Sequence, residues 1–296
     1  MSLIKKTVRK SLEIKVSGRS TDFITPSFGF GCLYNCSYCY CKRHVNDGVS
    51  IAENVNQILG VVSKHYVSLG EWFQKNKPNQ TDPNCITYDI GCNEDLALHA
   101  KHHNIQRIFS FSGKHDRMMF SFATKYVNYD LPIILSNPYS PGFKSVRIRF
   151  SLMPQKYSDV LEPNTSDILE RIKAIDKFIE MGYDVHINFS PVIVTDTWLE
   201  DYRDLFLLVD EHVSNKDQVK CEVIFLTHNE KKHKYNLANN VPGEDMLWRP
   251  EIQEPKKSQY GGDNIRYKYQ LKSNYVYQFK ALHNAIIPWN TIRYIF

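Results

Sequence analysis

Three cysteines with the spacing C-x3-C-x2-C stand near the start of the chain, at Cys32, Cys36 and Cys39. Cysteines this close together, in a sequence without a secretory signal, are typical of metal binding rather than of a disulfide framework. Three thiolates are one fewer than the four that usually hold an iron–sulfur cluster. One iron would then keep an open position for a ligand that is not part of the protein. The spacing therefore predicts a cluster that can bind a small molecule directly.

A zinc loop is the alternative interpretation, with Cys41 or His44 as the fourth ligand. Zinc sites of this kind more often pair two C-x2-C knuckles. The sequence has one such spacing, between Cys36 and Cys39, and no second one. The absence of a second knuckle favours the cluster over zinc.

The composition is that of an ordinary soluble enzyme, with 42% hydrophobic and 23% charged residues in 296. A net charge of +5 permits a nucleic-acid partner without requiring one. The sequence has no apolar run of 18 residues, so we expect no membrane span. The basic residues 1–19 lack the apolar core of a signal peptide. We therefore expect a cytoplasmic protein, in a compartment that keeps cysteines reduced.

The elements that must position the cysteines follow from hydrophobic periodicity, which alternates between strand and helix patterns. We expect strands at residues 22–30, 86–90, 118–124, 146–152, 185–189 and 221–226. We expect helices between them at 51–73, 95–109, 166–181 and 197–213. Six strands alternating with helices predict an α/β fold, a partial (β/α)6 barrel of the TIM type, whose chemistry lies at the C-terminal ends of the strands.

Three regions are expected along the chain. Residues 1–22 form a polar lead-in, and residues 23–228 form the barrel. Residues 229–296 are an extension that packs on the barrel as one unit with it. Residues 230–257 within it are charged and rich in turns, and a hairpin is predicted at 258–270 around two glycines. A helix at 274–287 and a strand at 291–296 complete it.

The cysteine loop resembles the cluster-binding loop of the radical S-adenosylmethionine (radical SAM) superfamily, which reads C-x3-C-x-aromatic-C, with Tyr38 as the aromatic residue. Within that superfamily, further motifs are similar in order and spacing to those of the spore photoproduct lyase family. These are Gly91-Cys92-Asn93-Glu94-Asp95, Ala123-Thr124-Lys125, Arg147-Ile148-Arg149-Phe150-Ser151, the run from Glu222 to His228, Tyr277-Gln278-Phe279-Lys280, and the run from Ile292 to Phe296. The similarity covers about residues 25–296.

The resemblance implies a lyase that repairs the methylene-bridged thymine dimer of ultraviolet-damaged DNA. A reduced [4Fe-4S] cluster, bound by Cys32, Cys36 and Cys39, would cleave S-adenosylmethionine to a 5′-deoxyadenosyl radical. That radical would remove a hydrogen atom from the bridged thymine, and a hydrogen atom would be returned after the bridge breaks. The cofactor supplies the radical chemistry and the protein supplies placement. We also expect a reducing donor such as flavodoxin or ferredoxin, and a monomer.

Further residues acquire roles through the same resemblance. Lys125 and Ser151 match positions that contact S-adenosylmethionine, and a lysine ammonium suits its carboxylate. Asp95 matches an acid on the cofactor side, and Tyr38 lies beside the adenosyl group.

For the catalytic steps, Cys92 matches the cysteine that returns the hydrogen atom. Tyr38 and Tyr40 match two tyrosines that carry the radical back from it. On residue type alone, Cys92 could instead be a small buried hydrophobic residue, and Tyr40 could be ordinary core. The remaining cysteines are interpreted as structural; they are Cys41, Cys85 and Cys221.

Two positions depart from the family pattern. The family hairpin carries an arginine before Tyr-Gly, whereas this chain has Gln259 before Tyr260. Basic and aromatic residues nevertheless remain, so Tyr260, Arg266 and Lys268 are predicted to bind DNA. The second departure is Glu94, where the family has a small hydroxyl residue.

Two other functions stay open. One is a radical SAM enzyme acting on a different nucleic-acid or small-molecule substrate. The other is a metal-binding DNA module without catalytic activity. His102, His103 and His115 stand on polar stretches and are predicted to be solvated.

Overall fold

The computed structural model describes residues 4–17, 19–41, 48–75, 83–258 and 261–296. The chain forms two compact units. The first comprises residues 1–33, 41–150 and 174–186, and the second comprises residues 34–40, 151–173 and 187–296. Gln259 and Tyr260 of the predicted hairpin lie outside the described residues, as does His44.

The first unit is built on parallel strands in the order β2-β3-β6-β7-β8, with only β2 antiparallel to its neighbour. Their bounds are β2 Lys15–Val16, β3 Phe23–Ile24, β6 Ile86–Asp89, β7 Met118–Thr124 and β8 Val146–Leu152. A smaller sheet joins β1 Ile4–Thr7, β5 Val49–Ala52 and β4 Gly29–Phe30. Strands β7 and β8 are buried along almost their whole length, as in sheets covered on both faces.

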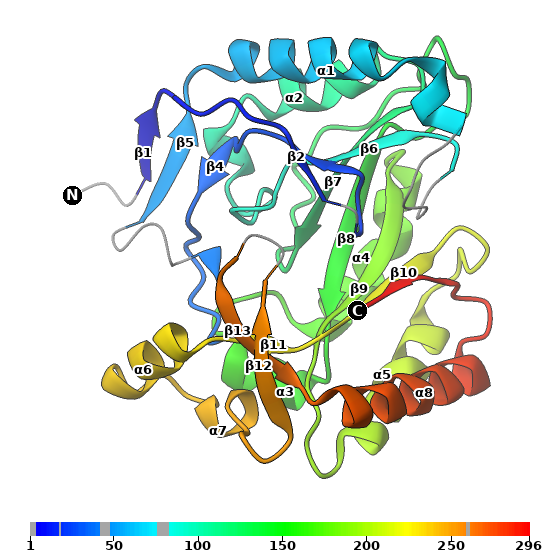
Figure 1. Ribbon diagram of the computed structural model, residues 1–296. Helices are drawn as coiled ribbons and strands as arrows, with labels where there is room; N and C mark the ends of the chain where they lie inside the picture. Colours follow the sequence, from blue (N-terminus) through cyan, green and yellow to red (C-terminus); the bar gives the residue numbers. More distant parts are fainter. Residues whose placement is uncertain (1–3, 18, 42–47, 76–82, 259–260) are drawn as a thin grey trace. The chain divides into compact units, whose positions relative to one another are not determined.

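Helices of the first unit cover this sheet. The long helix α1 (Val55–Lys75) and the shorter α2 (Ile105–Ser112) contact each other, and α2 contacts β7 (Figure 1). A turn of 3-10 helix, Ala100–His102, precedes α2. Helix α4 (Ile168–Glu180) continues from the second unit into the first.

The second unit contains the strand order β14-β10-β9, with β9 Asp184–Val192, β10 Lys220–Phe225 and β14 Ile292–Ile295. Helices α5 (Trp198–His212) and α8 (Tyr269–Ile286) pack side by side (Figure 1). Aromatic edge-to-face contacts fill the space beneath them, among Phe189, Tyr202, Phe206, Phe225 and Phe279.

The extension within this unit is a small antiparallel sheet with two helices beside it. Its strands are β11 (Thr227–His228), β13 (Asp263–Tyr267) and β12 (Gln253–Lys257). Helices α6 (Glu230–Ala238) and α7 (Glu244–Leu247) contact each other, and α6 contacts β13 (Figure 1). Helix α3 (Gln155–Leu161) follows β8. Strand β12 pairs with β13 in antiparallel register, and its residues 253–257 lie before the range 258–270 that was predicted for a hairpin.

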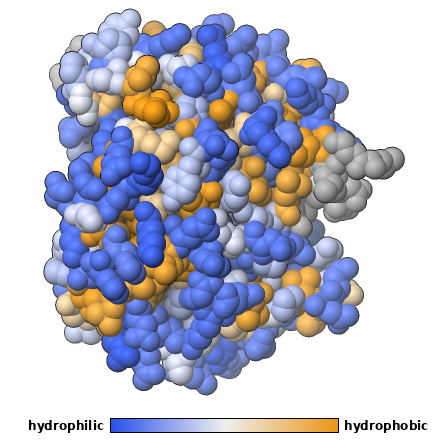
Figure 2. All heavy atoms as spheres, turned by 180° about the vertical axis from the view of Figure 1, so that it is seen from behind, coloured by the Kyte–Doolittle hydropathy of each residue, from blue (hydrophilic) through white to orange (hydrophobic). Residues whose placement is uncertain are grey.

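Polar residues predominate on the face seen in Figure 2, with apolar ones in small groups among them. Among the described residues, no helix has both the length and the apolar character needed to cross a membrane.

The predicted strands after the first one match β6, β7, β8, β9 and β10 to within a few residues. Two predictions were wrong. The strand at 22–30 is two short strands, because Pro26 between them has no N–H for a ladder bond. The helix expected from 95 begins only at Ile105, where Asn104 caps its N-terminus by accepting a hydrogen bond from the Arg107 amide.

Candidate active site

A tight turn at the end of β6 presents Cys92. The Gly91 amide donates a hydrogen bond to Oδ1 of Asp89 at 2.9 Å. A Cβ atom on Gly91 would lie 2.8 Å from Cβ of Phe122, so only glycine fits at this point. Cys92 follows directly and is half-buried. The turn thus fixes the backbone of this thiol at the C-terminal end of a barrel strand.

Asp95 joins this turn to the end of β7. Its buried carboxylate accepts hydrogen bonds from the Thr124 hydroxyl at 2.7 Å, the Lys125 amide at 2.9 Å and the Leu98 amide at 3.2 Å. The two oxygens of a carboxylate can accept about four hydrogen bonds, so these three bonds occupy most of their acceptor sites. Asp95 therefore holds the backbone from which the half-buried Lys125 side chain extends.

Ser151, near the end of β8, is buried, and its carbonyl accepts a hydrogen bond from Nη1 of Arg171 at 2.9 Å. The same Nη1 pairs with Oε2 of Glu162 at 2.8 Å, and neither side chain is exposed. The Ser166 carbonyl and the hydroxyls of Thr165 and Ser158 accept further hydrogen bonds from this guanidinium. A buried arginine with this many partners fixes the segment that follows β8.

Tyr38 is tied to the same ion pair. Its hydroxyl donates a hydrogen bond to Oε1 of Glu162. Burial and the adjacent Glu162 carboxylate raise the pKa of Tyr38 well above its usual value. Tyr40, in contrast, is 45% exposed. The two tyrosines predicted to carry a radical therefore sit in different surroundings.

Replacing Arg171 by methionine is expected to lower the free energy of unfolding by about 3–5 kcal/mol, because the Glu162 carboxylate would stay buried without its cation. Urea denaturation monitored by circular dichroism measures this change. The control is Lys177→Met, because Lys177 forms an exposed pair with Glu180 at 3.2 Å and such pairs contribute about 1 kcal/mol or less. Equal effects of the two substitutions would contradict a structural role for the buried pair.

The three predicted cluster ligands are divided between the units. Cys32 belongs to the first unit, and Cys36 and Cys39 belong to the second. Cys36 is buried, the other two are half-buried, and the Cys39 amide donates to the Cys36 carbonyl at 3.1 Å. All seven cysteines lie within the described residues and none forms a disulfide.

Three thiols close in sequence, none of them in a disulfide, are the type of donor that an iron–sulfur cluster takes. No group of three or more His, Cys, Asp or Glu side chains among the described residues is arranged to hold a metal ion. The cluster assignment therefore rests on the donor set and its spacing. The other cysteines are buried, as their structural interpretation expects; they are Cys41, Cys85 and Cys221.

Glu94, His99 and His103 form a buried group of hydrogen-bonded side chains that was not predicted from the sequence. Oε2 of Glu94 accepts hydrogen bonds from Nδ1 of His99 at 3.0 Å and Nε2 of His103 at 2.9 Å. Burial alone would raise the pKa of Glu94, but these two bonds lower it below the usual value. Nε2 of His99 in turn accepts a hydrogen bond from the Leu33 amide at 3.4 Å. The prediction that His103 is solvated was wrong, because it is a partner of this carboxylate.

Gly29 packs against the Glu94 carboxylate, which leaves no room for a side chain at position 29. A Cβ atom on Gly29 would lie 2.3 Å from the carboxylate atoms of Glu94. The longer side chain at position 94 therefore occupies space against the β4 backbone. The one sequence signal for the group of Glu94, His99 and His103 was that Glu94 departs from the family pattern.

The basic residues of the hairpin have partners within the extension. Arg266 pairs with Glu254 at 2.9 Å, and Nζ of Lys268 donates to the Glu251 carbonyl at 2.8 Å. Arg266 is half-buried and Lys268 is exposed. A phosphate contact by Arg266 would therefore compete with Glu254.

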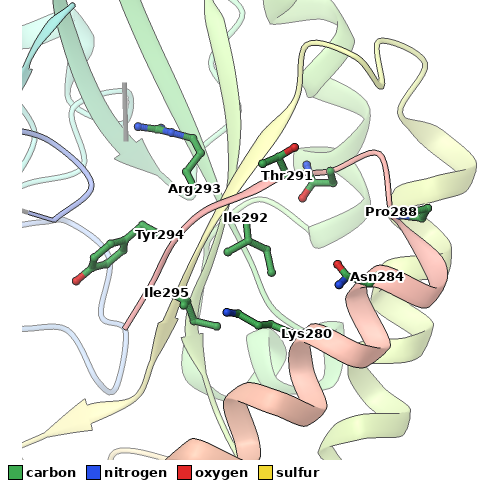
Figure 3. A pocket seen from close by; sticks show the side chains of 9 residues that line it. Lys280, Asn284, Pro288, Thr291, Ile292, Arg293, Tyr294 and Ile295 are labelled. Atoms are coloured by element: carbon green, nitrogen blue, oxygen red, sulfur yellow. The ribbon is translucent and has the colours of Figure 1, made fainter. Parts of the chain in front are cut away.

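A pocket of about 400 Å³ lies beside β14 and the C-terminal part of α8 (Figure 3). Figure 3 shows Lys280 of α8 and residues of β14 around it. Arg293 in its lining already pairs with the buried Glu222 at 3.2 Å. None of the predicted site residues lines this pocket, so we do not assign the chemistry to it.

Comparison with known proteins decides the family. The family model described as spore photoproduct lyase matches residues 2–296. The chain belongs to the spore photoproduct lyase family. A curated member, the spore photoproduct lyase of Bacillus subtilis (strain 168), is 25% identical over 260 residues. This alignment covers 86% of the chain and 70% of the relative.

Solved structures of spore photoproduct lyase share the fold. A mutant with bound AdoMet and dinucleoside spore photoproduct superposes with a TM-score of 0.83 at 18% identity, covering 99% of this chain and 82% of that one. A complex with dinucleoside spore photoproduct gives 0.82 at 19% identity, with the same coverages. The α/β partial-barrel fold predicted from the strand–helix order is therefore confirmed.

Proposed function

We propose that the chain is a radical SAM lyase that reverts the spore photoproduct, the methylene-bridged thymine dimer, to two thymines in DNA. The observation that carries this proposal is the family match over residues 2–296, which includes the Cys32–Cys39 loop. The solved relatives with dinucleoside spore photoproduct support the choice of substrate. DNA that contains damaged thymine is accordingly the partner.

Cys32, Cys36 and Cys39 would hold a [4Fe-4S] cluster, and S-adenosylmethionine would be the second cofactor. Together they supply the 5′-deoxyadenosyl radical that begins the reaction. Lys125 would bind the carboxylate of S-adenosylmethionine as a point charge. Ser151 would contact the same cofactor. Asp95 would act on the cofactor side through the Lys125 amide that it holds.

Cys92 would complete the repair. Its S–H bond breaks homolytically and a C–H bond forms on the product thymine, which leaves a sulfur-centred radical. Tyr40 would then donate its hydroxyl hydrogen atom to that sulfur, and Tyr38 would donate its own to the resulting Tyr40 radical, which leaves the radical on Tyr38. The Tyr38 hydroxyl donates a hydrogen bond to the Glu162 carboxylate, which would orient it for this role.

The remaining partners complete the proposal. The cluster needs one electron from a donor, for which we propose flavodoxin or ferredoxin. We further propose a monomer that works in the cytoplasm.

The hairpin would bind DNA through Tyr260, Arg266 and Lys268. Replacing Arg266 and Lys268 by glutamine together is expected to lower the slope of log affinity against log salt by about 0.9 for each phosphate that is no longer bound. Fluorescence anisotropy with duplex DNA over a series of salt concentrations measures the slope.

The matched control for the hairpin is Arg203→Gln, because Arg203 is exposed on α5 and pairs with its neighbour Asp204 at 3.1 Å. Tyr260→Ala should reduce the preference for damaged DNA more than the affinity for undamaged DNA. Unchanged DNA affinity after all three hairpin substitutions would leave the hairpin with a structural role alone.

The proposed function is tested by reconstituting the cluster under anaerobic conditions and incubating the enzyme with DNA irradiated in the dry state. Loss of spore photoproduct should require both S-adenosylmethionine and a reductant. Cleavage of S-adenosylmethionine without repair would point to a radical enzyme for another substrate. DNA binding without any cleavage of S-adenosylmethionine would point to a metal-binding DNA module.

A further inference from the structure

Ser37 lies between two of the predicted cluster ligands and is completely buried. All of its polar groups have partners. Its amide donates to the Leu161 carbonyl at 2.9 Å, and its hydroxyl donates to the Pro242 carbonyl at 2.9 Å. Its carbonyl accepts a hydrogen bond from Nδ2 of Asn236 at 2.9 Å. The cysteine loop is therefore held at its midpoint by groups far away in sequence.

Asn236 of α6 is itself fixed by a buried carboxylate. The same Nδ2 group donates its second hydrogen to Oε2 of Glu244. Oε1 of Glu244 accepts hydrogen bonds from Nε2 of His228 at 3.0 Å and Nδ1 of His233 at 2.6 Å. The His233 ring stacks on Trp248, with 4.1 Å between centroids and 11° between planes. The amide that reaches Ser37 is thus oriented by a carboxylate with three donors.

Helix α6 does not pack against the rest of the unit through an apolar face. Its buried residues are Lys232 and Asn236, whereas a surface helix usually docks through an apolar stripe. The leucine and tyrosine side chains of this helix, Leu237 and Tyr235, are more than half exposed. The polar contacts to the cysteine loop therefore account for its position better than hydrophobic burial does.

The side chains of Glu244, His228 and His233 are not arranged as a metal site. Each histidine directs a ring nitrogen at the same carboxylate oxygen instead of at a shared empty position. Among the residues that the structure describes, no such group is arranged to hold a metal ion. The arrangement instead resembles the outer contacts that orient metal ligands in other proteins.

We propose that α6 and α7 form a polar clamp that fixes the backbone of the cysteine loop at Ser37 before a cluster is inserted. Asn236 is the positioning residue, acting through the Ser37 carbonyl on the segment from Cys36 to Cys39. The proposal rests on the proposed function, because it assigns the clamp to a cluster at that loop. It gives the charged segment from His228 to Trp248 a role in cofactor retention.

The test compares Asn236→Ala with Asn239→Ala. Asn239 ends the same helix, is exposed, and donates its side-chain amide to the Tyr235 carbonyl, away from the loop. Hydrogen exchange of the cluster-free protein should show faster exchange at the Ser37 amide in Asn236→Ala and the wild-type rate in Asn239→Ala. Iron release from the reconstituted proteins to a chelator should be about 10–100-fold faster in Asn236→Ala alone, as is typical when a group that orients a metal ligand is removed.

A second pair of variants covers the case in which Asn236→Ala fails to fold. His233→Ala removes a donor to Glu244, whereas His233→Asn places an amide donor near the position of Nδ1. Fast iron release in the first and near-normal release in the second would support the clamp. Wild-type iron release and loop exchange in Asn236→Ala, or in His233→Ala if only that variant folds, would overturn it. If the wild-type chain takes up no iron, the proposed function fails instead, and exchange at the Ser37 amide still tests the clamp in the cluster-free protein.

Discussion

Replacing Cys92 with alanine is expected to stop the repair after the first hydrogen abstraction while leaving cofactor cleavage intact. The thiol is small, half-buried and held by the turn at Gly91, so alanine should fit with a loss of stability of about 1 kcal/mol. Cluster content and binding of S-adenosylmethionine should therefore match the wild type. The product radical, however, would have no hydrogen donor and would react with other reagents, such as dithionite-derived species.

Mass spectrometry of products from a dinucleoside substrate measures this outcome. Cys92→Ala should give 5′-deoxyadenosine at a near-normal rate, with trapped adducts in place of most of the normal thymine. Cys85→Ala is the matched control, because Cys85 is a buried cysteine without a proposed chemical role. Normal thymine from Cys92→Ala at the wild-type rate would show that this thiol is not the donor.

Replacing Cys39 with alanine is expected to abolish activity by removing one of the three cluster ligands. The reconstituted wild-type chain should hold about four irons and four sulfides, with a spectrum that changes when S-adenosylmethionine is added. Cys39→Ala should lose most of this iron and all detectable cleavage of S-adenosylmethionine.

Cys41→Ala separates the cluster from the zinc alternative. Cys41 is buried two residues beyond Cys39 and would be a fourth ligand only in a zinc site. Metal analysis of Cys41→Ala should therefore give the wild-type iron content. Stoichiometric zinc in the wild type, absent from both variants, would contradict the cluster.

Periodicity predicted the parts of the fold that bury apolar side chains. Strands β7 and β8 matched to the residue, because each is a run of buried residues between clear breaks. The segment from 95 to 104 did not become part of the predicted helix. There the Asp95 carboxylate bonds to backbone and side-chain groups of Thr124 and Lys125, which no local pattern encodes.

The site residues were likewise predictable only where local sequence patterns encode them. The cysteine spacing and the strand ends could be found in the sequence because their partners are near in the chain. The support of the loop could not, since Asn236 and Ser37 are separated by 199 residues. Helix α6 was missed for a related reason, because its buried residues are polar and give no apolar period. Glu94 was noticed only as a departure, and its two histidine partners emerged from the structure.

The most direct test of the account is the conversion of a dinucleoside spore photoproduct by the anaerobically reconstituted chain, with a cyclobutane thymine dimer as the matched control. Liquid chromatography with mass spectrometry would follow both substrates in the presence of S-adenosylmethionine and dithionite. The spore photoproduct should be converted to two thymines, and the cyclobutane dimer should not. Formation of 5′-deoxyadenosine with the spore photoproduct left intact would contradict it.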